Sequence, residues 1–330
     1  MMREIKVGFI GAGARARSAH YPCISRLEGV RIEAAAELDE GRLREVVERY
    51  RIPHPFLCRS KLDYRRMLEE VELDVVCVVM NETLVTPIAV DCMNAGKHVF
   101  IEKPPGASLE DSERLLEAAV ANGVFCMVGY QRRFAAVVRK AIELVRERGG
   151  VTLAVGEFHK NLLRSGPGAT STLWNDICHV VDLVRFMTGG EPIEITAYQD
   201  RFGAEWRNCY NALIKFSNGA VGIVTGNRAS GGRYLRAELH GIGVGCYMMI
   251  PDKLEIYMDN KPPELLSGAE LAGADEDDLF AYEGTLAMHE HFFECVRKGE
   301  TPCGDIRDVI HTSRLVDRLE RFRRVVIGGS

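Results

Sequence analysis

The stretch IKVGFIGAGARA, residues 5–16, decides the fold of the first part of the chain. Its first half is a short apolar run typical of a strand, and a helical pattern follows the glycines. Gly11 allows a tight turn, Gly13 lets another group approach the backbone, and Ala16 permits close packing of helix on strand. This spacing predicts a site for a dinucleotide pyrophosphate at the start of the helix. The residues expected to contact the cofactor here are Gly11, Gly13, Ala14, Arg15 and Ala16.

An acidic residue ends the next strand pattern. The run VRIEAAAE closes at Glu37, about 26 residues after the first glycine of the fingerprint. A carboxylate in that place can accept hydrogen bonds from both hydroxyls of a ribose and repels a 2′-phosphate. The sequence therefore favours NAD as the cofactor, while Arg42 and Arg44 nearby leave NADP open.

Strand and helix patterns then alternate up to residue 128. Short apolar runs at 74–80, 97–103 and 124–130 are separated by helical stretches, one of which carries a Ser108 and Asp111 capping signal. Such alternation predicts a doubly wound parallel sheet over residues 1–128, an NAD(P)-binding Rossmann domain. Ligands bind these sheets at the carboxyl ends of the strands. By that rule three further residues are expected to contact the cofactor, Asn81, Glu102 and Lys103.

The tripeptide Glu102-Lys103-Pro104 follows a central strand of this domain. Two prolines after the lysine hold it in a non-helical turn, and Pro104 is expected to be cis because cis-proline occurs in tight turns. Lys103 is then aimed at the cofactor crevice. The alternative is a surface lysine in a turn.

From residue 129 the alternation stops and strand-like runs dominate. In CYNALIKF (209–216) apolar residues recur at every second position, as in a strand with one buried face. The sequence predicts a C-terminal α+β domain over residues 129–330 with a large, mainly antiparallel sheet, one face covered by helices and the other available for an oligomer contact. Helices are expected at about 285–298 and 305–322, and an acidic loop at 267–278.

The stretch WNDICHVVDLVRF (174–186) predicts a helix with an acid and a histidine in its first turn. An apolar stripe faces the core, while Asp182 and Arg185 mark the solvent side together with Cys178. Asp176 and His179 lie roughly 60° apart on the opposite flank, where they point toward protein or a cleft. Asp176 could instead be the N-cap and His179 a half-buried histidine.

GAGARA, EKP and Asp-x-x-His occur in this order, and the chain resembles the Gfo/Idh/MocA family of NAD(P)-dependent oxidoreductases, which includes inositol dehydrogenases and glucose–fructose oxidoreductase. The resemblance also runs through AGKHVFIEKP, GYQRRF and HEHFFECVRKGETP. It implies three catalytic residues. His179 would take the hydroxyl proton near neutral pH, Asp176 would orient the imidazole or bind a hydroxyl, and Lys103 would stabilise negative charge on the same oxygen. The residues expected to bind substrate are Lys103, Tyr130, Arg133, Trp174, Asp176 and His179.

The sequence departs from the family at two places in the pocket wall. The segment VMNETLVTP keeps Asn81 but lacks the histidine of the family's TPN…H segment. SGPGATSTLWN replaces the usual glycine run and puts Trp174 beside the site, where an aromatic ring could stack on a sugar. The specific substrate therefore does not follow from the resemblance.

The expected function is hydride transfer between a nicotinamide and a secondary alcohol or ketone of a sugar, cyclitol or sugar derivative. One alternative is an NAD-dependent glycosidase of the same family, which would release an aglycone without net NADH. Another is a non-catalytic nucleotide-sensing regulator. Retention of Lys103, Asp176 and His179 argues against a sensor, which needs no proton-transfer set.

Bulk properties narrow the class of protein. The net charge of −5 over 330 residues gives no electrostatic footprint for nucleic acid or an anionic membrane. No apolar stretch approaches the roughly 20 residues of a membrane span. Ten scattered cysteines without a CxxC pair indicate reduced thiols and a cytoplasmic location. No metal is expected, since His289 and His291 are two apart and do not share a helix face. Family resemblance suggests a homodimer or homotetramer.

Overall fold

The computed structural model describes residues 3–322, which form two compact units. The first unit contains residues up to Tyr130 together with Thr285–Ile310, and the second contains Gln131–Gly284 and the chain from His311. The compact units differ from the expected division at residue 128 in one respect, because the chain returns to the first unit near its end. The assignment of one part to cofactor and the other to substrate stays a prediction.

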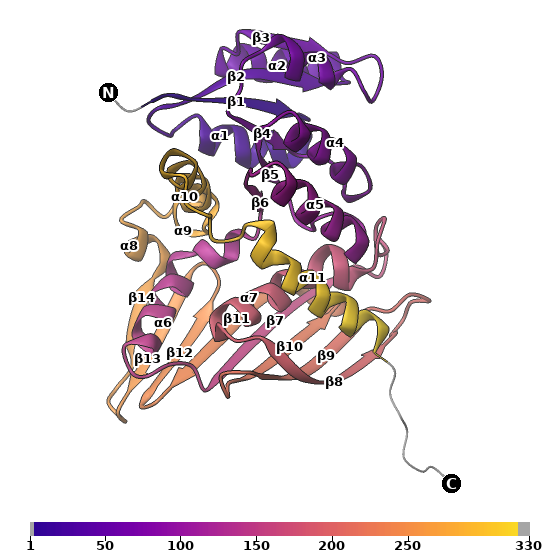
Figure 1. The fold of residues 1–330 in the computed structure, drawn as a ribbon. Coiled ribbons are helices and arrows are strands. Elements are labelled where there is room, and N and C mark those ends of the chain that lie inside the picture. The colour runs from indigo at the N-terminus through magenta and orange to yellow at the C-terminus, as the bar shows by residue number, and fades with distance from the viewer. Residues whose placement is uncertain (1–2, 323–330) are drawn as a thin grey trace. The chain divides into compact units, whose positions relative to one another are not determined.

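The first unit contains a sheet of six parallel strands in the order β3-β2-β1-β4-β5-β6 (Figure 1). This order confirms the doubly wound sheet. The strands are β1 (Ile5–Ile10), β2 (Val30–Glu37), β3 (His54–Leu57), β4 (Val75–Val78), β5 (His98–Ile101) and β6 (Cys126–Val128). The helices are the π-helical turn η1 (Ala16–His20), α1 (Tyr21–Ile24), α2 (Glu40–Tyr50), α3 (Tyr64–Glu70), α4 (Glu82–Asn94), α5 (Leu109–Ala121) and α10 (Thr285–Lys298).

Local sequence signals account for these elements. All four residues of β4 are buried, as expected for a central parallel strand of Val and Cys. Helix α5 begins where the Ser108 side chain accepts a hydrogen bond from the Asp111 backbone N–H at 3.2 Å, which confirms the predicted cap. It ends before Gly123, whose φ of 63° lies in the left-handed region.

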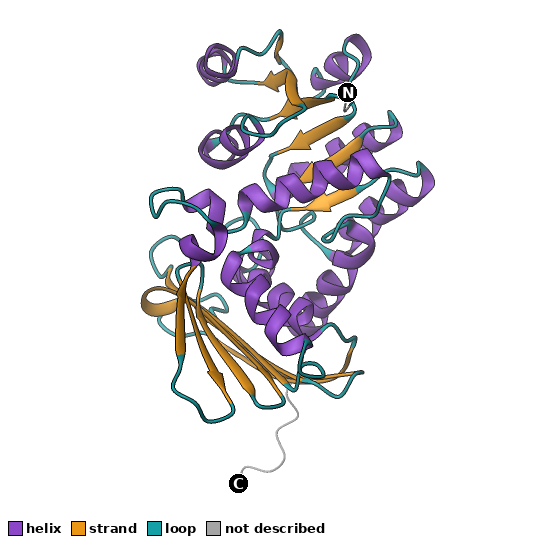
Figure 2. Cartoon of the chain, turned by 90° about the vertical axis from the view of Figure 1, so that its left-hand side faces the viewer, coloured by secondary structure: helices purple, strands orange, loops and turns teal. Residues whose placement is uncertain are grey.

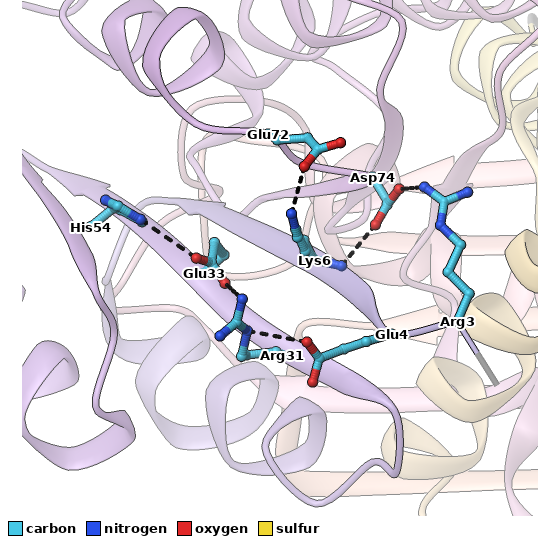
Figure 3. Close-up of polar contacts among 8 residues, drawn as sticks. All are labelled: Arg3, Glu4, Lys6, Arg31, Glu33, His54, Glu72 and Asp74. Atoms are coloured by element: carbon cyan, nitrogen blue, oxygen red, sulfur yellow. Dashed lines mark hydrogen bonds and ion pairs between the residues drawn. The ribbon is translucent and has the colours of Figure 1, made fainter. Parts of the chain in front are cut away.

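Charged side chains join neighbouring elements near the amino ends of the first strands (Figure 3). Lys6 on β1 binds Glu72 through its ammonium at 2.6 Å and Asp74 through its backbone N–H at 2.9 Å. Arg31 on β2 pairs with Glu33 at 2.6 Å. One partner of each ion pair, Glu72 or Arg31, is well exposed, so these pairs contribute little stability each. They lie at the opposite ends of the strands from the glycine loop and form no part of the predicted site.

The second unit contains a sheet of eight strands in the order β14-β13-β12-β11-β7-β10-β9-β8. Neighbouring strands are antiparallel except β7 and β10, which are parallel, so the mainly antiparallel sheet is confirmed. The strands are β7 (Leu153–Asn161), β8 (Pro192–Asp200), β9 (Cys209–Phe216), β10 (Val221–Asn227), β11 (Ala229–Gly241), β12 (Val244–Met249), β13 (Lys253–Met258) and β14 (Glu264–Ser267).

The remaining elements are helical. They are the 3₁₀ turn η2 (Gln131–Phe134), α6 (Ala136–Arg146), the π-helical turn η3 (Leu173–Ile177), α7 (Cys178–Thr188), α8 (Gly268–Ala272), α9 (Leu279–Tyr282) and α11 (Ile306–Arg321), which runs from the first unit into the second. The prediction of an acidic loop at 267–278 was wrong in its first half. Ser267 and Glu270 form a capping box that starts α8 there.

Helices α6 and α7 cover one face of the eight-stranded sheet (Figure 2). Two glycines allow α7 and the turn before it to lie close to the strands. A Cβ on Gly156 of β7 would lie 2.8 Å from Val184 Cγ2, and one on Gly226 of β10 would lie 2.6 Å from Ile177 Cδ1. The small residues of the sheet therefore fix the position of the segment that carries Asp176 and His179.

The predicted solvent side of α7 was wrong. Asp182 and Arg185 are 1% and 6% exposed, and Cys178 is buried with them. Asp182 accepts hydrogen bonds from Arg133 Nε at 2.7 Å and from the Thr312 hydroxyl at 2.8 Å. Polar residues on this side meet partners from α11 and η2 instead of water, because the helix is covered on both sides.

Candidate active site

Gly11 and Gly13 of the loop after β1 differ in how much space a side chain would have at each position. Gly11 has a φ of 99°, and a Cβ there would lie 2.5 Å from the carbonyl oxygen of Val79. Gly13 has no atom within 4 Å of the position that a Cβ would take. Gly11 is therefore needed for the turn itself, whereas Gly13 leaves open space over the backbone that a phosphate can use.

Glu37 ties the end of β2 to the glycine loop. Its Oε2 accepts a hydrogen bond from the Ala12 N–H at 2.6 Å, and its Oε1 accepts from the Leu38 and Asp39 N–H groups at 2.8 and 3.1 Å. These contacts fix the carboxylate at the carboxyl end of β2. Its expected contact with a ribose stays a prediction.

A cavity of about 240 Å³ opens beside this carboxylate within the first unit. Glu37, Ser60 and Lys61 give its lining polar groups. Most of the other lining side chains are apolar, among them Leu38, Met80 and Ile88. An apolar slot next to a hydroxyl acceptor suits the adenosine half of a dinucleotide. The residues present therefore fit the cofactor that the fingerprint predicts.

Asn81, another expected cofactor residue, is the N-cap of α4. Its Oδ1 accepts hydrogen bonds from the backbone N–H and the hydroxyl of Thr83, both at 2.9 Å. This capping role accounts for an asparagine at the start of α4. A contact with the cofactor stays a prediction.

Glu102 of the EKP turn is the centre of a polar cluster. Its Oε1 accepts hydrogen bonds from Arg15 Nε at 2.9 Å and from His20 Nε2 at 2.8 Å, and its Oε2 accepts from the Lys103 N–H at 3.0 Å. Burial raises the pKa of the Glu102 carboxyl, but the His20 hydrogen bond and the charges of Arg15 and Lys103 outweigh it and hold the pKa well below its usual range. The carboxylate thus binds the glycine loop to the turn that carries Lys103. The Lys103–Pro104 bond is cis, as expected.

Two buried histidines extend this cluster, and the sequence did not identify their contact. His20 Nδ1 lies 2.9 Å from His289 Nε2, and both side chains are fully buried. His20 Nε2 faces the Glu102 carboxylate and therefore donates to it, and one proton lies between His20 Nδ1 and His289 Nε2. Burial lowers the pKa of His289 well below its usual value. No spacing rule reveals this pair, because α10 comes from the far end of the chain.

Asp176 and His179 lie in the second unit, on η3 and α7. Asp176 pairs with two cations, through Oδ1 with Lys160 Nζ at 2.8 Å and through Oδ2 with Arg228 Nε at 2.9 Å. Asp176 is therefore not the N-cap of α7. Sequence reasoning did not identify Lys160 or Arg228. Lys160 lies on β7, and Arg228 is the single residue between β10 and β11.

The ring of Phe158 connects these groups. Lys160 Nζ lies 4.5 Å and Arg228 Cζ 4.6 Å from its centroid, and the His179 ring meets it edge-on at 6.2 Å. Arg228 has no exposed surface and also donates to the Phe158 carbonyl. Burial lowers the pKa of Arg228, and the charge of Asp176 raises it. The site thus places a carboxylate and a histidine next to an aromatic ring that also contacts two cations.

The other predicted substrate residues are buried. Tyr130 and Trp174 are 2% and 6% exposed. Arg133 is 1% exposed and its guanidinium binds Asp182 through both Nε and Nη2, at 2.7 and 2.5 Å. The charge of Arg133 is matched by Asp182 inside the second unit. A contact of Arg133 with substrate stays a prediction.

Known families match both parts of the chain. Residues 5–130 match the family described as "Oxidoreductase family, NAD-binding Rossmann fold", and residues 155–243 match the GFO/IDH/MocA C-terminal domain. A Bacillus subtilis protein called uncharacterized oxidoreductase YrbE is 26% identical, covering 84% of this chain and 89% of its own. The NAD⁺-dependent scyllo-inositol 2-dehydrogenase of the same organism is 23% identical, covering 92% of this chain and 89% of its own.

A solved structure with the same fold is that of levoglucosan dehydrogenase in complex with NADH and levoglucosan. Its TM-score is 0.83 at 18% identity, with 96% of each chain covered. The chain therefore belongs to the Gfo/Idh/MocA family of oxidoreductases. It is an oxidoreductase whose first domain has an NAD-binding Rossmann fold.

Among residues 3–322, no group of three or more His, Cys, Asp or Glu side chains is arranged to hold a metal ion. Within the same range, no helix is both long and apolar enough to cross a membrane.

Proposed function

We propose that this protein oxidises a secondary alcohol of a sugar, cyclitol or sugar derivative, or reduces the matching ketone. The observation that carries the proposal is the retention of Lys103, Asp176 and His179 in a chain of this family. Relatives named as inositol dehydrogenases support a polyol as substrate.

The cofactor, when bound along Gly13 and Glu37, supplies a hydride acceptor. Removal of the hydroxyl proton falls to His179, whose imidazole can accept it near neutral pH. Lys103 stabilises the negative charge that develops on the same oxygen, and Asp176 binds a neighbouring hydroxyl. The two cations bound to Asp176 favour its ionised form. An anionic acceptor is therefore better suited to a hydroxyl than to a proton-shuttling role.

The same proposal includes a homodimer or homotetramer in the cytoplasm. Apolar side chains on the face of the sheet away from α7 are exposed and would be covered by a second copy. They are Tyr198, Leu213, Tyr234, Tyr247, Met249, Tyr257 and Leu265. The ten cysteines of the chain form no disulfide bonds, as in a reducing compartment such as the cytoplasm. Light scattering at micromolar concentration tests the assembly, and a monomer would contradict it.

The first experiment is a scan at 340 nm. Purified protein is mixed with NAD or NADP and with inositols, aldoses, alditols, sugar acids and nucleotide sugars. NADH formation with one substrate class supports the proposal. No NADH with any of them, although NAD binds, would favour the glycosidase or sensor alternative, and release of an aglycone without net NADH would identify the glycosidase.

A further inference from the structure

We propose that the substrate carries an anionic group, a carboxylate or a phosphate, and that Lys160 and Arg233 bind it. This inference rests on the proposed function, because it places the anion beside the hydroxyl held by Asp176 and His179. It goes beyond that function by naming the chemical class of the substrate and two residues that select it.

Three cations surround one aromatic ring in the second unit. Lys160 Nζ, Arg228 Cζ and Arg233 Cζ lie 4.5, 4.6 and 5.7 Å from the centroid of the Phe158 ring. Two come from neighbouring strands, β7 and β11, which pair at Phe158 and Leu235. The register of the sheet therefore brings the three charges together at one end of these strands.

Asp176 neutralises only part of this charge. Its carboxylate binds both Lys160 and Arg228, so one negative charge is shared between two positive ones, and Arg233 adds a third. Arg228 Nη2 is buried without a hydrogen-bond partner among the described residues. These four groups carry three positive charges and one negative charge, and burial of Arg228 keeps solvent from screening its charge fully.

The three cations have different access to a ligand. Arg228 is fully buried, so it acts through Asp176 as a positioning residue. The Lys160 side chain is 26% exposed, and Arg233 is exposed. The accessible Lys160 and Arg233 are therefore the groups that an anionic substrate would meet, as charge-assisted hydrogen-bond donors.

Matched substrate pairs test the inference. Each alditol is compared with the aldonate and the alditol phosphate of the same carbon chain, using glucitol, mannitol and galactitol as the parent compounds. We measure kcat and KM with NAD, and the binding of each compound to the NAD-loaded protein by calorimetry. Binding is measured as well because it does not depend on turnover.

We expect at least one anionic series to bind and react at least 10-fold better than its neutral parents, mainly through KM. Lys160→Gln and Arg233→Gln should each reduce this preference at least 5-fold. Lys253→Gln is the matched control, since it removes the same charge from an exposed lysine on β13 and should leave the preference unchanged. A preference for aldonates over phosphates, or the reverse, identifies the anion.

Two outcomes would overturn the inference. If neutral alditols react as well as both anionic series, the substrate needs no anionic group, while the dehydrogenase function stands. If the preference for anionic substrates is unchanged in both variants, Lys160 and Arg233 do not bind the anion. Absence of turnover with every compound counts against the proposed function. In that case the ratio of anionic to neutral binding constants tests the anionic substrate class. Anionic compounds that bind no better than their neutral parents, or do not bind, contradict that class.

Discussion

Arg133 and Asp182 form an ion pair whose two side chains are each 1% exposed. Nε of the arginine donates to Oδ2 of the aspartate at 2.7 Å, and the Thr312 hydroxyl donates to the other oxygen. The pair joins η2 to α7, the helix that carries His179. Removing the charge of one partner leaves the charge of the other buried without a counter-ion, which destabilises the fold.

Arg133→Met should therefore lower the free energy of unfolding by about 3–5 kcal/mol. Urea denaturation measures this effect. Arg139→Met, which removes an exposed arginine from α6, is the control and should change stability by less than about 0.5 kcal/mol. A fully stable Arg133→Met protein with a raised KM would instead support Arg133 as a substrate-binding residue.

The two glycines of the cofactor loop should respond differently to a side chain. Gly13→Val places its side chain in open space, so the protein should keep its melting temperature and bind NAD at least 10-fold more weakly. Gly11→Val should instead destabilise the fold, because a Cβ there meets the Val79 carbonyl and φ is 99°. Thermal melting and NAD titration separate the two effects. Equal NAD affinity of Gly13→Val and the unchanged protein would disprove phosphate binding at this position.

His179→Ala should reduce kcat at least 100-fold while NAD affinity stays within about 2-fold, because general-base catalysis contributes about 10²–10⁴ in rate. His159→Ala is the control. That histidine stacks on Tyr234 and lies next to Phe158 in the strand, on its opposite face. Its replacement should change kcat by less than about 3-fold. Unchanged turnover of His179→Ala would exclude His179 as the base.

His289 should make folding stability depend on pH below about 6.5. Burial lowers the pKa of His289 in the folded protein well below the usual value for histidine of about 6.5, so the unfolded chain binds the proton first. Stability from this group is complete above pH 6.5 and is lost as the pH falls below that value. His289→Phe should remove up to about 1.4 kcal/mol per pH unit from the slope of unfolding free energy between pH 5 and 6.5.

Denaturant titrations at several pH values check this slope. His54→Phe, which removes an exposed histidine of β3, should leave it unchanged. The carboxyl of Glu102 does not interfere in this range, because its pKa is lowered and its contribution is lost only below the usual carboxyl range. A slope that is the same in His289→Phe and the unchanged protein would contradict a neutral, buried His289.

Much of the fold could be predicted because it depends on local periodicity. Apolar runs separated by capped helices predicted the parallel sheet, and alternation in CYNALIKF predicted a strand with Tyr210, Ala212, Ile214 and Phe216 buried, as observed. Burial on the other side of α7 was missed. Its charged residues, Asp182 and Arg185, follow the same spacing whether water or a partner faces them.

The sequence by itself determined the glycine loop, the EKP turn and the Asp-x-x-His segment, because each depends on neighbouring residues and their backbone preferences. Only the tertiary structure decided which side chains meet: His289 with His20, Arg133 with Asp182, and Lys160 and Arg228 with Asp176. These contacts join residues that are 16 to 269 positions apart. Strand register and helix packing bring them together, and neither is visible in local spacing.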